Sequence, residues 1–242
     1  MRQNSVNMRK LFRYLKWIAF VLSAVFMLYS CRSVPAPVPQ PQMGSSKVFD
    51  VVLFEPYSKI GLIEKNQLSQ NNDSLSSLVS QLIKDVCARN CWIPIADTIS
   101  INNDTILFSY KSLLYHLENA GDRYQVTVPP ELNSLIESSG HRFGMILWAT
   151  GYERTKGNYR SIVAENIVLC VLSGILTFGT TFYYPPIYKG SLRINAAIVD
   201  TTNESVVYHN TAFLNDSKPI DYLCVHTIVK KLFSDYYTPD KI

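Results

Sequence analysis

The sequence has no long run of charge of one sign. Of its 23 basic side chains, five lie in residues 1–30, where there is no acidic side chain, and this leaves 18 basic against 19 acidic groups in the remainder. The formal net charge of +4 therefore comes from the amino terminus, and the rest of the chain is close to neutral. Without a basic stretch there is no electrostatic basis for sequence-independent binding to phosphates, and we expect no nucleic-acid partner.

Catalytic and metal-binding motifs are also lacking. The patterns G-x-S-x-G and H-E-x-x-H and a phosphate-binding glycine loop do not occur. The four histidines, His116, His141, His209 and His226, do not have the spacing of a metal site or of a catalytic triad. We therefore expect a protein that is not an enzyme, with no catalytic residues, no metal and no cofactor.

Cysteines are few, and two of them lie close together. Cys87 and Cys91 are four positions apart at the end of a predicted helix. Unpaired, partly buried thiols are the preferred interpretation, because an undistorted helix gives poor disulfide geometry at this spacing. A disulfide formed after the helix end frays stays open as an alternative, whereas zinc is disfavoured because no second ligand pair follows. Cys170 and Cys224 lie in apolar runs and are expected to be small core residues.

An export signal is predicted at the amino terminus. Arg2, Arg9, Lys10, Arg13 and Lys16 precede the apolar run 17–29, in which Ser23 is the polar exception. As a helix this run reaches about 20 Å, at about 1.5 Å per residue. The hydrocarbon core of a membrane is about 30 Å thick, so the run is short for a permanent span and typical of a signal peptide.

The apolar run ends in Leu28-Tyr29-Ser30-Cys31, which resembles the lipobox of bacterial lipoproteins. Leu28 and Ser30 match the family's aliphatic and small positions. The resemblance implies a signal peptide over residues 1–30, cleavage before Cys31, and lipid attachment at Cys31 through acyl chains such as palmitate. Arg32, in place of the aspartate that favours retention in the inner membrane, suggests the outer membrane, with the protein facing the periplasm. The alternative is an uncleaved signal anchor with an incidental cysteine.

A proline-rich linker follows the cysteine. The stretch SVPAPVPQPQMGSS, residues 33–46, has no charge and no aromatic side chain and favours an extended polyproline conformation. We assign residues 31–47 to the lipidated cysteine and the linker. Residues 48–242 then form one globular domain that is large enough to bury a core.

Strand and helix patterns alternate along residues 48–242. The clearest is an amphipathic helix at 71–90, whose apolar residues recur at helical spacing. The predicted fold class is α/β, a mixed sheet with an antiparallel C-terminal hairpin and helices packed on it. We expect strands at 47–56, 91–101, 104–110, 142–154, 191–200 and 205–214, and further helices at 112–122, 129–140 and 220–236.

Three segments of this region resemble small envelope lipoproteins. They are the helix start Pro-Glu-Leu at 130–132, the strand GMILWATG at 144–151 and the hairpin AAIVDTTNESVVYH at 196–209. The family group contains relatives of the curli secretion-channel lipoprotein and the outer-membrane activator of a penicillin-binding protein. Asp200 ends the first hairpin strand as in that group, and Tyr208 stands where tryptophan is common. The resemblance implies an α/β fold and a role in envelope assembly, and transfers no catalytic residue.

An apolar insert interrupts the domain at 162–188. No charged side chain occurs between Glu165 and Lys189. Three interpretations stay open: a core segment buried beneath the sheet or against a partner, a segment that dips into a bilayer, and a second membrane span. The core segment is the preferred one of the three.

The expected function is that of a membrane-anchored envelope lipoprotein with a non-enzymatic binding, scaffolding or assembly role. Its partners would be the membrane, through the lipid anchor, and an envelope protein or further copies of itself. The alternative is an oligomeric transport or secretion component whose apolar insert enters the bilayer.

Overall fold

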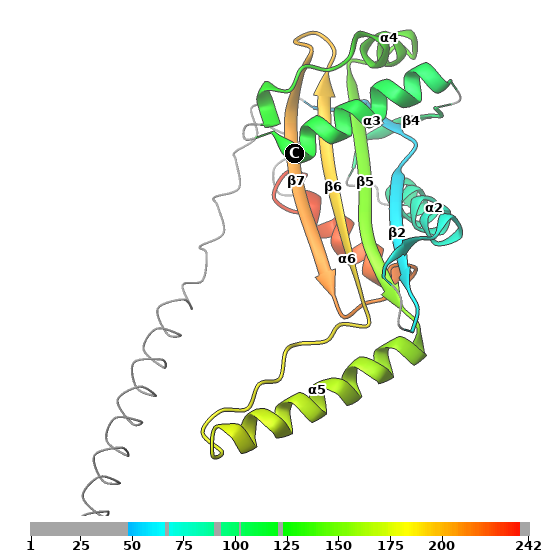
Figure 1. Cartoon of the computed structure of the whole chain (residues 1–242). Helices are drawn as coiled ribbons and strands as arrows, with labels where there is room; N and C mark the ends of the chain where they lie inside the picture. The colour runs from blue at the N-terminus through cyan, green and yellow to red at the C-terminus, as the bar shows by residue number, and fades with distance from the viewer. Residues whose placement is uncertain (1–47, 66–67, 90–92, 102, 121–122, 238–242) are drawn as a thin grey trace, which may run out of the picture. The chain divides into compact units, whose positions relative to one another are not determined.

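The computed structural model describes residues 48–65, 68–89, 93–101, 103–120 and 123–237 (Figure 1). The predicted signal peptide, Cys31, the linker and Cys91 lie outside these ranges. In chain order the elements are β1 (Val51–Phe54), β2 (Tyr57–Ile63), β3 (Gln70–Asn71), α2 (Asp73–Arg89), β4 (Ile95–Ile99), α3 (Asp104–Asn119), η2 (Arg123–Gln125), α4 (Pro130–Ser138), β5 (Phe143–Arg154), α5 (Lys156–Leu176), β6 (Gly190–Asp200), β7 (Ser205–Asn215) and α6 (Tyr222–Phe233).

The strands form one sheet around β5. On one side β5 pairs with antiparallel β6, which in turn pairs with antiparallel β7. On the other side the start of β5 pairs with parallel β1, and its later part pairs with parallel β2. β4 lies parallel to β1, and β3 lies antiparallel to β2. The predicted fold class, a mixed α/β sheet with an antiparallel C-terminal hairpin, is confirmed.

β2 was not among the strands that the sequence predicted. β1 and β2 follow each other along the same side of β5, and Pro56, which has no N–H to donate to the ladder, lies between them. The polar Ser58 interrupts the apolar alternation that would indicate a strand in β2, although its side chain is buried in the structure. The hydroxyl of Ser80 on α2 donates a hydrogen bond to Ser58 Oγ (3.0 Å), so the polar side chain has a partner beneath the helix.

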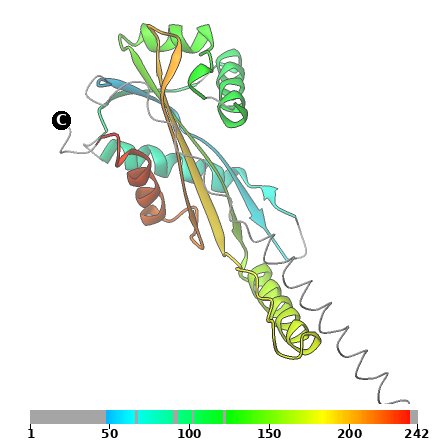
Figure 2. The ribbon, with the colours of Figure 1, turned by 90° about the vertical axis from the view of Figure 1, so that its left-hand side faces the viewer.

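Two hydrophobic cores lie on the two faces of the sheet. Met145 and Leu147 of β5 contact the core beneath α2 and α6, whereas Ile146 and Trp148 contact the core beneath α3 and α4. Figure 2 shows the sheet edge-on with α6 on one side and α3 on the other. Burial on both faces explains why the sequence of β5 is apolar without interruption.

The predicted strand at 104–110 is wrong, because these residues form the first half of α3. Asn103 caps the helix, and its side chain accepts a hydrogen bond from Thr105 N (2.8 Å). Tyr110, Leu113 and Leu117 are buried at helical spacing. The β-branched and aromatic residues at 105–108 have strand propensity, but the cap and the packed face determine the helix.

The connection between β5 and β6 is unusually long for neighbouring antiparallel strands. Glu153 pairs with Gly190, and Arg154 N donates to Lys189 O (2.8 Å), so the strand ends are already adjacent. A two-residue turn suffices to join such strands. Instead the chain inserts residues 155–189, which comprise α5 and the segment that returns to β6. We call this insertion the apolar arm.

Candidate functional site: an open sheet face and an apolar arm

The helices α3 and α4 cover only one end of their face of the sheet. Figure 1 shows β5, β6 and β7 continuing uncovered from α3 toward the apolar arm. A cavity of about 650 Å³ lies on this open face. The residues that line it are Leu117, Glu118, Asn119, Arg123, Trp148, Thr150, Arg193, Asn195, His209, Thr211 and Phe213.

The floor of the cavity consists of buried polar side chains on neighbouring strands. Asn195 of β6 and His209 of β7 are 7% and 5% exposed, respectively. Asn195 Oδ1 accepts a hydrogen bond from Thr211 Oγ1 (2.8 Å), which leaves the amide nitrogen to face the cavity. The ring of His209 lies 5.9 Å from that of Trp148, and the structure shows it no hydrogen-bond partner among the described residues.

The charges around the cavity sum to a small positive excess. Burial, assisted by the positive charge of Arg123, lowers the pKa of His209 to about 3, so its imidazole is neutral at physiological pH. Trp148 Nε1 donates to Glu118 Oε1 (2.8 Å), which engages the carboxylate at the rim. Arg193 is exposed and lies over the ring of Phe213 at 6.0 Å. The cavity therefore offers two guanidinium groups and neutral hydrogen-bonding groups to a ligand.

The apolar arm presents aliphatic side chains to its surroundings. By length and composition α5 is apolar enough to cross a membrane, and only 11% of its most apolar stretch is buried. The segment is therefore not buried beneath the sheet, which was the first form of the preferred interpretation, whereas the second form, burial against a partner, stays a prediction. The exposed large apolar residues of the arm are Ile167, Val168, Leu169, Val171, Leu172, Ile175, Leu176, Phe178, Phe182, Tyr183 and Tyr184.

Beyond Glu165, the polar side chains of α5 and of its C-cap residue point to the opposite side, toward the returning chain. Asn166 is buried and donates from Nδ2 to Pro185 O (3.4 Å). Ser173 Oγ accepts from Tyr183 N (2.8 Å), and Thr177 Oγ1 accepts from Thr181 N (3.1 Å). Gly174 is also buried, because the ring of Phe182 occupies the space where a side chain would lie. The arm is thus a helix bonded to its own return segment.

Two residues singled out by the family resemblance have structural roles. Asp200 is fully buried and receives bonds from Arg142 Nε and Nη2 (both 2.7 Å). Tyr208 packs on the ring of Tyr236 at 4.2 Å, and its hydroxyl donates to Leu232 O at the end of α6. These side chains hold the β6–β7 turn and α6 in place, and neither lines the cavity.

The three cysteines that the structure describes, Cys87, Cys170 and Cys224, form no disulfide with one another. Cys87 lies on α2 and is buried, and burial raises the pKa of its thiol to about 12. Its potential disulfide partner, Cys91, lies outside the described residues, so the disulfide stays an open alternative to unpaired thiols. Cys224 is buried as expected, whereas Cys170 is half-buried in α5. Within the described ranges, no group of three His, Cys, Asp or Glu side chains is arranged to hold a metal ion.

The cavity was not predicted from the sequence. Its residues come from α3, η2, β5, β6 and β7, and the isolated His209 has no neighbour in the chain that indicates a site. The available signal was the polar Asn195 between the apolar residues Ile194 and Ala196 of β6.

No family model and no curated protein matches the chain. Among solved structures, the PelC dodecamer from Paraburkholderia phytofirmans has 9% identity and a TM-score of 0.38 over 83% of this chain and 95% of that one. The LpoB C-terminal domain from Salmonella enterica has 8% identity and a TM-score of 0.27 over 70% and 91%. Lipoprotein GNA1162 from Neisseria meningitidis has 11% identity and a TM-score of 0.28 over 78% and 99%. A lipoprotein is thus among the solved structures to which the chain is similar.

Proposed function

We propose that the chain is a lipid-anchored protein of the Gram-negative cell envelope that works by binding and not by catalysis. In this proposal acylated Cys31 holds it in the outer membrane, residues 31–47 form a linker, and residues 48–242 face the periplasm as one domain. The open sheet face is the binding surface. The observation that supports binding is the cavity of about 650 Å³ with Asn195 and His209 buried in its floor.

The chemistry of the cavity favours an acidic partner. Arg123 and Arg193 lie at the cavity and supply donors that match carboxylates in a bidentate manner. Asn195 and the neutral ring of His209 supply hydrogen bonds without a further charge. Buried polar groups of this kind reach their full number of bonds when a ligand contacts them. We therefore propose an envelope protein that presents acidic side chains to this face.

Site-specific photocross-linking in living cells tests the binding surface. A photoreactive amino acid replaces Thr211, which is exposed in the cavity, or as a matched control Thr202, which is exposed in the β6–β7 turn. We expect a defined covalent adduct at position 211 that is absent at 202 and is lost when Arg193→Glu is added. Equal adducts at the two positions, or an adduct that is unaffected by Arg193→Glu, would contradict binding through this face.

Mass spectrometry of the protein from its own membrane tests the anchor. We expect the mature chain to begin at Cys31 with acyl chains attached, because two or three buried chains hold a protein stably, at about 0.8 kcal/mol per methylene. The Cys31→Ser variant should keep residues 1–30 and carry no lipid. An intact amino terminus with an unmodified thiol in the unaltered protein would rule the anchor out.

A further inference from the structure

We propose that the apolar arm inserts into one leaflet of a lipid bilayer. This inference goes beyond binding through the open sheet face and comes from different residues. Of the three interpretations of the apolar insert, we select the segment that dips into a bilayer.

The polarity of the arm is reversed relative to a surface helix in water. A helix on a water-soluble domain turns its apolar residues inward and its polar residues outward. In α5 beyond Glu165, Asn166, Ser173 and Thr177 face the returning chain and bond to it, whereas the aliphatic side chains face outward. Leu172, Ile175 and Leu176 are 48%, 66% and 78% exposed. Such an arrangement is favourable in hydrocarbon, where backbone groups need partners within the protein.

The aliphatic surface is too wide for a docking groove. At about 100° per residue, the exposed residues from Ile167 to Leu176 extend over about 200° of the helix circumference, and the polar stripe fills the side that faces the return segment. A helix that docks in a groove presents a narrower stripe of about 100°. Lipid, in contrast, contacts every outward side chain at once. The breadth of the surface therefore favours a bilayer over a protein partner or a second copy.

The length of the uncharged part matches one leaflet. From Asn166 to Leu176 the helix rises about 16 Å, at about 1.5 Å per residue. One leaflet contributes about 15 Å, half of a hydrocarbon core of about 30 Å. Phe178, at the tip, is 96% exposed and would lie near the middle of the bilayer. This uncharged part is too short to span the membrane, and by itself it provides no path across it.

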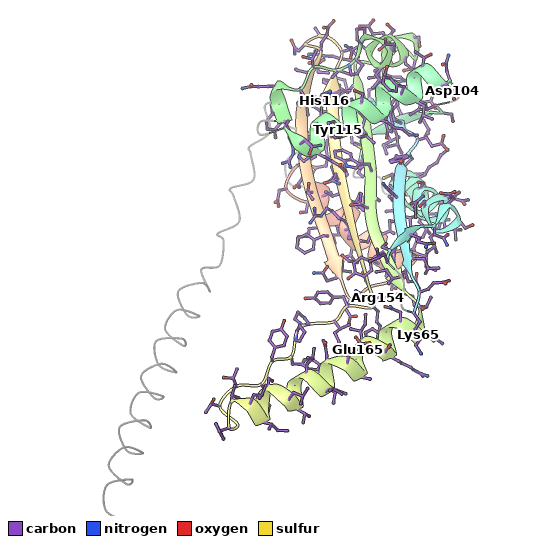
Figure 3. All side chains as sticks on the ribbon, in the orientation of Figure 1. Lys65, Asp104, Tyr115, His116, Arg154 and Glu165 are labelled. Carbon is purple, nitrogen blue, oxygen red and sulfur yellow. The ribbon has the colours of Figure 1, made fainter. Side chains whose placement is uncertain are left out.

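The charged residues of the arm lie between the sheet and Glu165 along α5, and at Lys189 where the return segment meets β6. Lys156, Arg160 and Lys189 are exposed near the sheet, and no charged side chain occurs between Glu165 and Lys189. Figure 3 shows Arg154 where the sheet meets the arm and Glu165 partway along α5. Basic side chains at this level complement the phosphates of lipid headgroups.

Depth-dependent fluorescence quenching tests the insertion. The acylated full-length chain, with Cys91→Ser and Cys170→Ser as background, is reconstituted in vesicles of phosphatidylethanolamine and phosphatidylglycerol. An environment-sensitive fluorophore is attached at Leu172→Cys in α5. The matched control is Phe108→Cys in α3, where the native side chain is also apolar and is 75% exposed. Cys87 and Cys224 are buried and do not compete for the label.

We expect the label at position 172 to emit at shorter wavelength and to be quenched by nitroxides on lipid acyl chains. The label at position 108 should be quenched by aqueous iodide instead. Iodide quenching at 172 equal to that at 108 would place the arm in water and overturn the proposal. Protection from both quenchers would show burial in protein, such as a second copy, and would overturn it as well.

A second position measures the depth. A label at Phe178→Cys should be quenched most by nitroxides near the acyl-chain ends and should be protected from iodide on both sides of the vesicle. Accessibility to iodide trapped inside the vesicle would show a full span and would contradict insertion into one leaflet. These results do not depend on the adduct at position 211, so the two proposals fail separately.

Discussion

Asp200 shows how a single buried charge stabilises the β6–β7 turn. Burial alone would raise the pKa of its carboxyl, but the bonds from Arg142, Thr202 N and Asn203 outweigh this effect and hold the pKa below its usual value. The ionised form is therefore more stable in the folded chain than in the unfolded chain. Its contribution to stability is complete above the unfolded pKa of about 3.9 and is lost as the pH falls toward the folded value.

The Asp200→Asn variant tests this role. We expect the free energy of unfolding at neutral pH to decrease by about 1.5–3 kcal/mol, because charge-assisted hydrogen bonds to a buried group are lost. Chemical denaturation at a series of pH values measures the difference between the two proteins. The difference should shrink below about pH 4, where the native carboxyl also becomes protonated. A constant difference down to acid pH would contradict the assigned ionisation.

The lowered pKa of His209 predicts that the stability of the folded chain also falls with acidification, beginning at a higher pH than the effect of Asp200. Burial lowers its pKa to about 3, whereas an unfolded histidine titrates near 6.5. The stability contribution is therefore complete above about pH 6.5 and is lost progressively between about pH 6.5 and 3, by at most about 1.4 kcal/mol per pH unit. The His209→Gln variant cannot take up this proton, so we expect it to lose less stability over that range. Parallel denaturation curves that change equally with pH would refute the depressed pKa.

At the scale of elements, most helices and strands were predictable because each has a local pattern. The buried residues Val79, Ile83 and Val86 of α2 follow the predicted helical stripe, and the apolar run of β5 indicated burial on both faces. The start of α3 was not predictable from propensity, because one cap and a packed face outweigh the β-branched residues. The exposure of α5 was not predictable either, since an apolar run has the same sequence whether protein or lipid surrounds it.

We expect the hydrogen bonds within the apolar arm to hold the return segment against α5. The double variant Ser173→Ala and Thr177→Val removes two acceptors for backbone N–H groups of the return segment. At about 1 kcal/mol per bond, we expect the segment to detach about 5–30-fold more often. Limited proteolysis by chymotrypsin after Phe182 and Tyr183 measures this increase.

A control for the arm is available on the same helix. Ser161 bonds to Glu165 within α5 and makes no bond to the return segment. The Ser161→Ala variant should therefore be cleaved at the rate of the unaltered protein. If both variants were cleaved equally fast, the bonds of Ser173 and Thr177 would have no role in holding the segment.

At the scale of the molecule, the cores of the sheet do not depend on the apolar arm. The two cores contain residues of every other helix, whereas in α5 only Asn158, Asn166 and Gly174 are buried. The sequence could not show this division, because the pairing of β5 with β6 brings together strands on either side of the insertion. Once that pairing is known, the arm is an addition to a hairpin that needs only a short turn.

Replacement of residues 155–188 by Asn-Gly tests whether the sheet and its cores fold without the apolar arm. The dipeptide favours the turn that joins antiparallel strands, and it would connect Arg154 to Lys189, which already share a hydrogen bond. We expect the free energy of unfolding of the remaining domain to change by no more than about 1–2 kcal/mol, because the main losses are a few hydrogen bonds such as that from Asn158 Nδ2 to Glu64 O. Denaturation with urea measures the change. A segment needed for the core would unfold the domain when removed, whereas an arm for the membrane leaves a folded and more soluble protein, because the exposed apolar surface is gone.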